Sequence, residues 1–286
     1  MKVVNQVCSL KNYSKKSDFI NDLGSSRSFA KKYMKNLSDP INEKEVLSIP
    51  IDVLNRGLIN PLYNGEKIEI IHECEKFLAL NKPTKVHMHP HSYSESDNIL
   101  SFLRSQNLNH VLEVNSSNYD RGLLYRLDYE TSGIVVLSKS NELYELIRNN
   151  FNEISKRKIY LTIVEGKLEG KEYLESKIIE SGVKGKKMKL DENGKSCSLS
   201  YEVIRSNEKF SLLKVELETG LRHQIRCQLA SIGHSIIGDN LYGNIASDRL
   251  YLHAYEYEFE VNNQIYNFKS KKLELFSKFF NVDSIL

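Results

Sequence analysis

One carboxylate in this chain stands where nucleophiles and general bases commonly sit. Asp128 lies in the nonapeptide YRLDYETSG, residues 125–133, between two apolar runs. The pattern predicts a strand over residues 122–125, a tight turn and a second strand over residues 134–137. An Asp at this junction projects from a rigid element into open space. Because an unperturbed Asp has a pKa of about 3.9, it is ionised at neutral pH and needs positioning more than activation.

The nonapeptide closely resembles the His-Arg-Leu-Asp-x-x-Thr-Ser-Gly signature of RluA-type pseudouridine synthases, enzymes that convert uridine in RNA to its carbon-linked isomer. Further segments resemble the same family in the same order. They are NKP at residues 81–83 running to His89-Pro90, KIY at residues 158–160 followed by Gly166, and TGLRHQIR at residues 219–226 continued through residue 243. Together the matches run from about residue 77 to residue 254. Any one of these matches could arise by chance, but four matches in the family's order hardly can.

The resemblance implies three catalytic residues and one further RNA contact. Asp128 is implied as the nucleophile, Arg226 as the arginine paired with it, and Tyr160 as the active-site tyrosine on which the base stacks. A bidentate arginine both offsets the cost of a buried carboxylate and fixes its oxygens. Arg126 resembles the arginine that fills the place of the flipped base or contacts backbone phosphate. Taken alone, these residues have ordinary alternatives: a tyrosine in the core, an arginine on a helix surface, a structural ion pair.

The implied reaction breaks the bond from ribose to nitrogen 1 of uracil, turns the base and rejoins it through carbon 5. It needs no redox change and no outside group, so no cofactor is expected, and the sequence has no glycine-rich dinucleotide motif or P-loop. Extruding the nucleotide costs a few kcal/mol, and stacking of the base on an aromatic ring is worth about 1–3 kcal/mol.

Many short apolar runs and few helical patterns predict an α+β catalytic domain over residues 73–286, with a mainly antiparallel mixed sheet of the pseudouridine synthase type. Helices are expected at residues 99–106, 141–151 and 223–232. Strands are expected at residues 77–81, 123–125, 134–137, 159–165, 174–179, 199–204, 210–218, 250–257 and 265–268.

Residues 1–72 are predicted to form a small α/β RNA-binding domain. The net charge of +3 arises within residues 1–70, since the rest of the chain is balanced. No structure is assigned up to about residue 16; helices are expected at residues 17–23 and 27–36, and short strands near residues 41–42 and 65–71. The arrangement resembles a diverged S-four-like RNA-binding domain, named for small-subunit ribosomal protein four. A basic stripe on the second helix would contact RNA, or else is a solvated face: Arg27, Lys31, Lys32 and Lys35.

The sequence contains no pattern typical of a membrane span, a secretory signal or a metal site. No window approaches the length of an apolar membrane span, and no signal peptide opens the chain, so a cytoplasmic protein without a membrane partner is expected. Nothing in the sequence demands more than a monomer, so a monomer is expected. The four cysteines form no Cys-x-x-Cys pair. His87, His89 and His91 alternate, but no carboxylate or cysteine cluster completes a tetrahedral metal set, so no metal is expected. Asp239 is expected to fix a turn.

Departures from the family pattern concern substrate grip more than reaction type. Tyr125 stands where the family usually has His, and Leu221 replaces an arginine; both are expected to alter how the RNA strand is held. Residues 84–85 are Thr-Lys where a glycine is common. The lysine-rich residues 184–189 resemble a hairpin tip, which either touches phosphate or is a solvated turn.

The predicted activity is therefore isomerisation of specific uridines in structured RNA, with large-subunit ribosomal RNA as the first expected substrate and transfer RNA as the second. A non-catalytic RNA-binding or ribosome-assembly protein on the same fold is the alternative, and the intact set of Asp128, Tyr160 and Arg226 weighs against it. A hydrolase using Asp128 with a histidine has little support, because no Ser or Cys elbow accompanies it.

Overall fold

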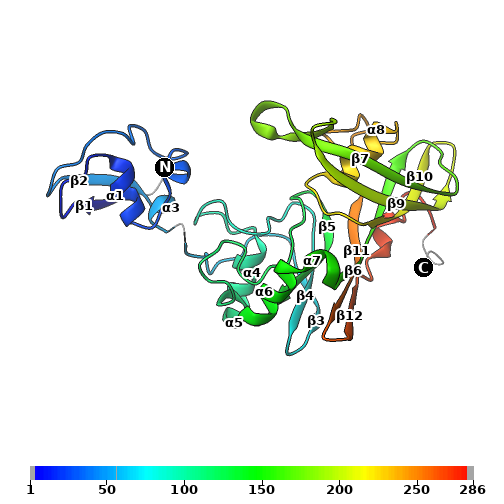
Figure 1. Cartoon of the computed structure of the whole chain (residues 1–286), viewed down its shortest axis with the longest axis horizontal. Coiled ribbons are helices and arrows are strands. Elements are labelled where there is room, and N and C mark those ends of the chain that lie inside the picture. The colour runs from blue at the N-terminus through cyan, green and yellow to red at the C-terminus, as the bar shows by residue number, and fades with distance from the viewer. Residues whose placement is uncertain (1–3, 56, 282–286) are drawn as a thin grey trace.

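A computed structural model describes residues 4–55 and 57–281. Its N-terminal module is a two-stranded antiparallel sheet of β1 (Val4–Cys8) and β2 (Val46–Pro50) with α1 (Lys16–Asp22), α2 (Arg27–Ala30) and α3 (Ile51–Leu54). Its core is separate from the rest of the molecule and consists of Phe19, Ile20, Ala30, Leu37, Ile41, Leu47, Ile49 and Val53. Figure 1 shows the module beside the catalytic domain, on the side that carries α4.

The module differs from the sequence prediction at several places, and its β2 and α3 were not predicted. β1 lies in the segment to which no structure was assigned, because its residues are mostly exposed and show no apolar periodicity. The second predicted helix is regular only over α2; hydrogen-bonded turns follow it as far as Met34, and Asn36 then adopts φ 57°. The strand predicted near residues 41–42 is a single bridge from Tyr13 to Ile41.

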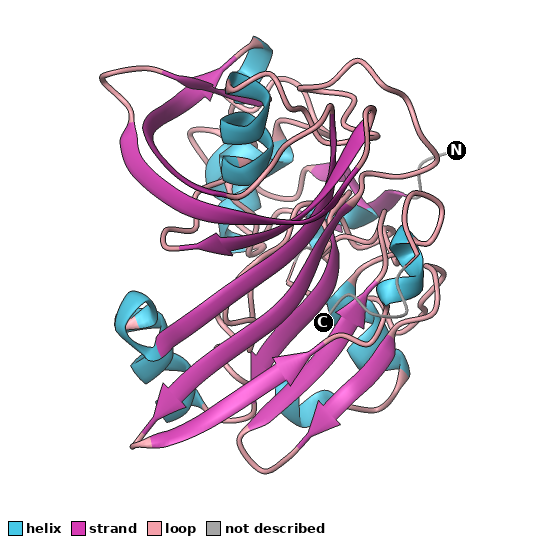
Figure 2. Ribbon diagram, turned by 90° about the vertical axis from the view of Figure 1, so that its right-hand side faces the viewer, coloured by secondary structure: helices cyan, strands magenta, loops and turns pink. Residues whose placement is uncertain are grey.

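The rest of the chain is built on one large sheet (Figure 2). Its ten strands have the order β3-β4-β5-β11-β6-β10-β9-β7-β8, with β12 paired to β11. Among the strands of this sheet that the structure describes, only β5 and β11 pair in parallel, so the predicted α+β class with a mainly antiparallel sheet is confirmed. The strands are β3 (Glu69–Glu73), β4 (Phe77–Lys82), β5 (Ser132–Ser138), β6 (Ser155–Glu165), β7 (Lys171–Ser181), β8 (Lys187–Leu190), β9 (Lys195–Ser206), β10 (Phe210–Leu217), β11 (Leu252–Val261) and β12 (Gln264–Lys269).

The sheet forks at β11. The start of β11 pairs with β5 through His253 and Ala254, whereas its second half pairs with β12. β5 is buried along its whole length, as expected for a central strand with an almost continuous apolar run. Gly133 makes the parallel approach possible, because it has φ 119° and a Cβ there would overlap the Ala254 backbone. The glycine of the YRLDYETSG segment is thus required by the packing of β5 on β11.

Helices and short 3-10 turns connect or follow the strands of the sheet. They are α4 (Ile99–Ser105), α5 (Asn109–Leu112), α6 (Asn141–Asn149), α7 (Phe151–Ile154), α8 (Gln224–Ser231) and the short 3-10 helices Val183–Gly185 and Leu273–Phe276. Side-chain caps begin two of them: Asn98 accepts from Ser101 N before α4, and Ser140 accepts from Leu143 N before α6. In the part of the chain that the structure describes, no helix is long and apolar enough to cross a membrane.

The domain boundary lies earlier than the predicted division at residues 72 and 73. β3 spans that division and pairs with β4 of the large sheet. Ile59 and Ile68 also belong to the core of the large domain, whereas Val53 belongs to the module. The N-terminal module therefore ends near α3, and the strand-like residues 65–71 mostly lead into the catalytic sheet.

Candidate active site

Asp128 lies in the turn that leads into β5. The segment before it is not the predicted strand: it runs beside β5 through one bridge, Leu123 to Leu137, and a hydrogen bond from Leu124 N to Val136 O of 3.1 Å. The predicted tight turn is present, since Thr131 N donates to Asp128 O at 3.1 Å. The Asp128 side chain is 27% exposed, so it is held by the fold and still open to a ligand.

Arg226, on α8, lies beside this carboxylate. Its Nη1 lies 3.4 Å from Asp128 Oδ2, so the structure brings the two residues together. The geometry is not the predicted bidentate one. Arg226 instead forms two short bonds to Asp239, Nε to Oδ2 at 2.7 Å and Nη2 to Oδ1 at 2.8 Å, and Nη2 also donates to Glu130 at 3.0 Å. The side chain is 2% exposed, so three carboxylates surround one buried guanidinium.

Asp239 fixes a turn, as predicted, because its Oδ1 accepts from the backbone N–H groups of Leu241 and Tyr242. Its second role, as the main partner of Arg226, was not predicted. Burial acts to raise the pKa of Asp239, but hydrogen bonds and charge from Arg226 hold it below its usual value. For Arg226, burial acts to lower the pKa, and the surrounding carboxylates raise it overall. The two groups are therefore a permanent ion pair that orients Arg226 toward Asp128.

Tyr160, on β6, lies close enough to Asp128 to interact with its charge. Its hydroxyl is 2.6 Å from the Tyr257 hydroxyl, and its ring is 6% exposed. Burial raises the pKa of Tyr160 above its ordinary value, and the nearby negative charge of Asp128 raises it further. The structure therefore brings the three predicted catalytic residues to one place, with Tyr160 as a largely covered ring.

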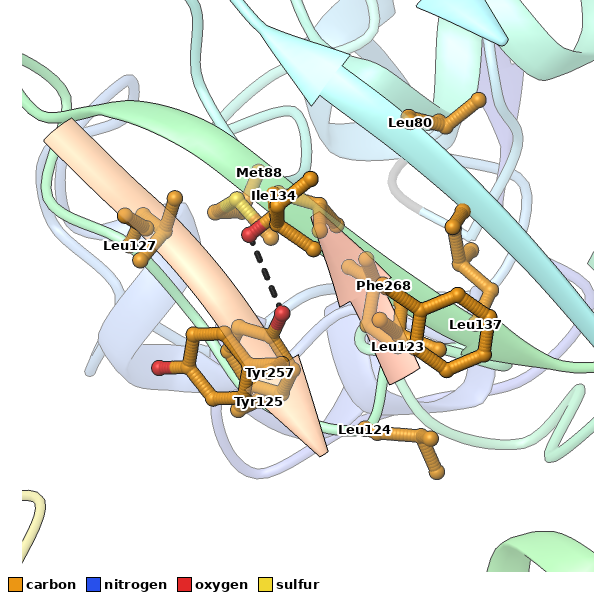
Figure 3. Close-up of a cluster of buried hydrophobic side chains, with 14 of the residues drawn as sticks. Leu80, Met88, Leu123, Leu124, Tyr125, Leu127, Ile134, Leu137, Tyr257 and Phe268 are labelled. Carbon is orange, nitrogen blue, oxygen red and sulfur yellow. Dashed lines mark hydrogen bonds between the residues drawn. The ribbon is translucent and has the colours of Figure 1, made fainter. Parts of the chain in front are cut away.

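Tyr125 is a core residue, not an RNA contact. Its ring stacks on Tyr257 with centroids 4.0 Å apart and planes at 9°, and its hydroxyl donates to Ile134 O at 3.0 Å (Figure 3). Burial raises its pKa well above the ordinary value. A direct contact of Tyr125 with RNA is not supported, because its side chain faces the packed interior between β5 and β11. Through Tyr257, which bonds to Tyr160, it instead supports the site.

Leu221 is also a packing residue. It lies against an apolar cluster of Ile178, Met188, Cys197 and Cys227, so this departure does not place a group toward RNA either. The neighbouring Arg222 donates to the carbonyls of Gly185 at 2.8 Å and Lys186 at 3.1 Å. The lysine-rich segment expected as a hairpin tip joins β7 to β8, and Arg222 ties it to the start of α8.

Arg126 is 60% exposed, as a residue that meets RNA requires. Its Nη1 lies 3.6 Å from Asp120 Oδ1, which is an ion pair but not a hydrogen bond. Asp120 Oδ1 is buried and has no hydrogen-bond partner in the described residues. Arg126 is therefore only loosely restrained beside Asp128.

Lys82 was not predicted as part of the site, yet it holds the Asp128 turn. It is fully buried at the end of β4, and its Nζ donates to the carbonyls of Pro83 at 3.0 Å, Val86 at 2.9 Å and Tyr129 at 3.2 Å. Burial lowers the pKa of Lys82 to about 7, although the negative charge of Asp128 opposes this effect. The lysine of the NKP segment thus ties the early loop to the residue that follows Asp128.

His223 is a second residue that was not predicted. It precedes α8 in the left-handed conformation, with φ 52°, and its Nε2 lies 3.8 Å from Asp128 Oδ2. Its Nδ1 is 3.0 Å from the Tyr242 hydroxyl, and the Tyr242 ring also faces the Arg226 guanidinium at 5.5 Å. Burial lowers the pKa of His223, and Asp128 opposes that shift. The HQIR block therefore supplies two groups to the site, at either end of its first helical turn.

The predicted RNA-binding residues of the module are all exposed: Arg27, Lys31, Lys32 and Lys35. Although the helix ends early, the turns that continue it keep these side chains in solvent. Arg27 donates to Ser38 at 3.0 Å. Among the residues that the structure describes, no group of His, Cys, Asp and Glu has the arrangement of a metal site.

Comparison with known proteins identifies a common family. The sequence model described as RNA pseudouridylate synthase matches residues 76–231, more than half of the chain. A protein of Aquifex aeolicus named "uncharacterized RNA pseudouridine synthase" is 32% identical over 76% of this chain and 72% of its own. The ribosomal large subunit pseudouridine synthase D of Borreliella burgdorferi is 25% identical over 89% of this chain and 82% of its own.

Solved structures share the fold. Human RNA pseudouridylate synthase domain containing 1 superimposes with a TM-score of 0.62 and 19% identity, covering 76% of this chain and 89% of that one. Human RNA pseudouridylate synthase domain containing 4 superimposes with a TM-score of 0.56 and 20% identity, covering 73% of this chain and 90% of that one. At these identities the likeness concerns the arrangement of the sheet and helices.

Proposed function

The chain belongs to the RluA-type family of RNA pseudouridine synthases, and from this premise we propose that it isomerises specific uridines of large-subunit ribosomal RNA with Asp128 as the nucleophile. The observation that supports this most is the contact of Arg226 with Asp128 across 98 residues of sequence. A partly open carboxylate beside a buried cation is the arrangement that an ionised nucleophile at a sugar needs. Positioning, not activation, is what the surrounding residues supply.

In the proposed mechanism Asp128 acts at the ribose of an extruded uridine. An Asp128 carboxylate oxygen bonds to carbon 1′ as the bond from carbon 1′ to nitrogen 1 breaks with its electron pair on the base. The base turns, carbon 5 then forms the new bond to carbon 1′, and the bond to Asp128 breaks with its electron pair returning to the carboxylate. Carbon 5 then loses its proton and nitrogen 1 gains one, so that atoms and charge balance without a cofactor. Arg226 keeps the Asp128 carboxylate oriented, while Asp239 keeps Arg226 in place.

Tyr160 and Arg126 have the remaining proposed roles. Tyr160 forms the floor on which the freed base rests, and its low exposure limits this contact to part of the ring. Arg126 is exposed and weakly paired, so it is free to enter the space that the flipped base leaves or to bind a phosphate. Both roles serve the extrusion step, which is easiest in single-stranded or weakly paired RNA.

The N-terminal module is proposed to bind the same RNA as an S-four-like domain. Its exposed basic residues support phosphate contact, which carries affinity without sequence information. We also propose that the protein acts as a monomer in the cytoplasm. Ribosomal RNA is the first proposed substrate because several similar proteins carry the name ribosomal large subunit pseudouridine synthase D.

A pseudouridine map of cellular RNA, with and without this gene, tests the substrate. The proposal expects loss of one or a few sites in large-subunit ribosomal RNA, restored by the wild-type gene and not by the Asp128→Asn variant. Loss of sites in transfer RNA alone would move the substrate to that class. An unchanged map in every RNA would contradict the proposed function.

A further inference from the structure

Tyr129, the residue after Asp128, presents an aromatic face to solvent beside the site. Its ring is 40% exposed and stacks on His87, with centroids 4.2 Å apart and planes at 29°. His91 meets the His87 ring edge-on, with the two ring centroids 4.8 Å apart. No role in the reaction described above uses these three rings.

The pair is held rigidly. Tyr129 O accepts from Lys85 N at 2.8 Å and from Lys82 Nζ at 3.2 Å. His87 N donates to Asp97 O at 3.0 Å, and His87 O accepts from Ile99 N at 3.0 Å. Because the backbone at both rings is fixed, an incoming ring meets a preformed surface and little conformational freedom is lost on binding.

Charge around the pair disfavours phosphate. The groups that act on the Tyr129 hydroxyl are Asp97, Glu95 and Glu130, all carboxylates. Around His87 they are Glu95, His91, Asp97 and Lys82, and Glu95 Oε1 lies 3.4 Å from His87 Nε2. Burial lowers the pKa of His87, which favours a neutral ring. The chemistry of this surface therefore suits an uncharged planar group.

The surface also lies on the way from Asp128 to the N-terminal module. Residues 91–97 connect the two: Glu95 contacts His87, while Ser94 donates to Asp52 of the module through its N at 3.0 Å and its Oγ at 2.7 Å. Tyr33, which follows Lys31 and Lys32 in the chain, is close enough to Ser92, Asp52 and Glu95 for them to affect its pKa. An RNA strand that reaches from Asp128 to the basic residues of the module therefore passes the rings of Tyr129 and His87.

We propose that Tyr129, backed by His87, is a stacking platform for the base of a nucleotide adjacent to the target uridine, on the side of the strand that leads to the N-terminal module. The inference rests on the proposed function, because it takes Asp128 as the position of the target. Base stacking on an aromatic face tolerates any base, so the platform supplies affinity and register, and sequence is read elsewhere.

Two measurements test the platform: binding of a single-stranded oligouridylate by fluorescence anisotropy, and tritium release from RNA labelled at carbon 5 of uridine. For Tyr129→Ala, the dissociation constant and KM are expected to rise about 5- to 100-fold, with kcat unchanged, as loss of one base stack implies. Tyr129→Phe keeps the ring and is expected to match wild type. Tyr173→Ala, which removes another exposed tyrosine on β7, is the matched control and is expected to change neither value.

Binding of Tyr129→Ala within about twofold of wild type, which is below the loss of any stacked base, would overturn the platform. So would a Tyr129→Phe variant that behaves like Tyr129→Ala, or a fall in kcat with KM unchanged, which would assign the ring to the positioning of Asp128. The proposed function is tested separately by wild-type tritium release. An active wild type with a neutral Tyr129→Ala rejects only the platform, whereas Tyr129-dependent binding without isomerisation rejects only the proposed reaction.

Discussion

Arg226 and Asp239 form a buried ion pair with two hydrogen bonds, 2.7 and 2.8 Å long, and this pair aims the third nitrogen of Arg226 at Asp128. The nucleophile candidate is thus oriented by an arginine that is itself fixed by another carboxylate. Asp239 in turn is held by the backbone N–H groups of its own turn. The HQIR helix and the following turn therefore act together on Asp128.

Asp239→Asn is expected to lower both stability and activity. The amide keeps the shape and the turn acceptor but removes the charge that balances a buried guanidinium. Breaking such a pair costs about 3–5 kcal/mol, measurable by urea unfolding, and kcat for tritium release falls with it. Asp248→Asn, in the exposed pair with Lys278, is the control and is expected to cost less than about 1 kcal/mol. Unchanged stability and kcat in Asp239→Asn would contradict the proposed role of the pair.

His253 is expected to make the fold sensitive to acid. It joins the two branches of the sheet at the fork, with Nδ1 2.8 Å from Ser132 Oγ and Nε2 2.8 Å from Ser270 Oγ. Burial lowers its pKa to about 3. Since the unfolded chain takes up a proton below a pH of about 6.5 and the folded chain does not, stability is present above that value and is lost as the pH falls toward 3.

From this group alone, the free energy of unfolding is expected to be about 2 kcal/mol lower at pH 5 than at pH 7. His253→Gln removes the titration, so its stability is lower at pH 7 but changes less between the two values. His110→Gln alters an exposed histidine and is expected to keep the wild-type profile. Equal pH slopes in wild type and His253→Gln would show that this histidine is not responsible.

Tyr125→Phe is expected to affect stability and not RNA binding. The variant keeps the stack on Tyr257 and loses one hydrogen bond to Ile134 O, a loss of about 1 kcal/mol. Thermal or urea unfolding measures the first effect, and KM for RNA measures the second. A raised KM with unchanged stability would return Tyr125 to the role of an RNA contact.

Charge reversal on the module is expected to weaken RNA binding without slowing the chemical step. The double variant Lys31→Glu and Lys35→Glu removes two exposed cations, so the dissociation constant rises. In a plot of the logarithm of the dissociation constant against the logarithm of the salt concentration, the slope decreases by about 0.7 for each phosphate that the variant no longer neutralises. The double variant Lys195→Glu and Lys209→Glu reverses two exposed charges on the catalytic domain and serves as the control. Equal effects of both double variants on binding would mean that net charge alone matters.

The sequence predicted which three residues meet at the proposed active site because each of them lies in a motif. Asp128, Tyr160 and Arg226 come from separate segments, and their approach follows from the family's fold. The strands of the large sheet were predicted for a simpler reason, since buried strands such as β5 carry apolar runs.

What the sequence did not predict are relationships between side chains that are decided in three dimensions. Asp239 follows a glycine in a turn, and nothing local indicates that it holds Arg226. Tyr125 is polar at one end and follows an apolar run, so its burial depends on Tyr257 more than 100 residues away. The helical spacing of Tyr33 and Met34 predicted a longer basic helix in the module than the structure has. The two side chains still pack on the core, because turns and a left-handed Asn36 follow the regular helix.

Tritium release from RNA labelled at carbon 5 of uridine, with wild type and Asp128→Asn compared on the same RNA, tests the account most directly. Asp128 is the group proposed to act at the ribose, so the variant is expected to release no tritium above background while its RNA dissociation constant stays within a few-fold of wild type. Release by Asp128→Asn at the wild-type rate would contradict the assignment of Asp128 as the nucleophile.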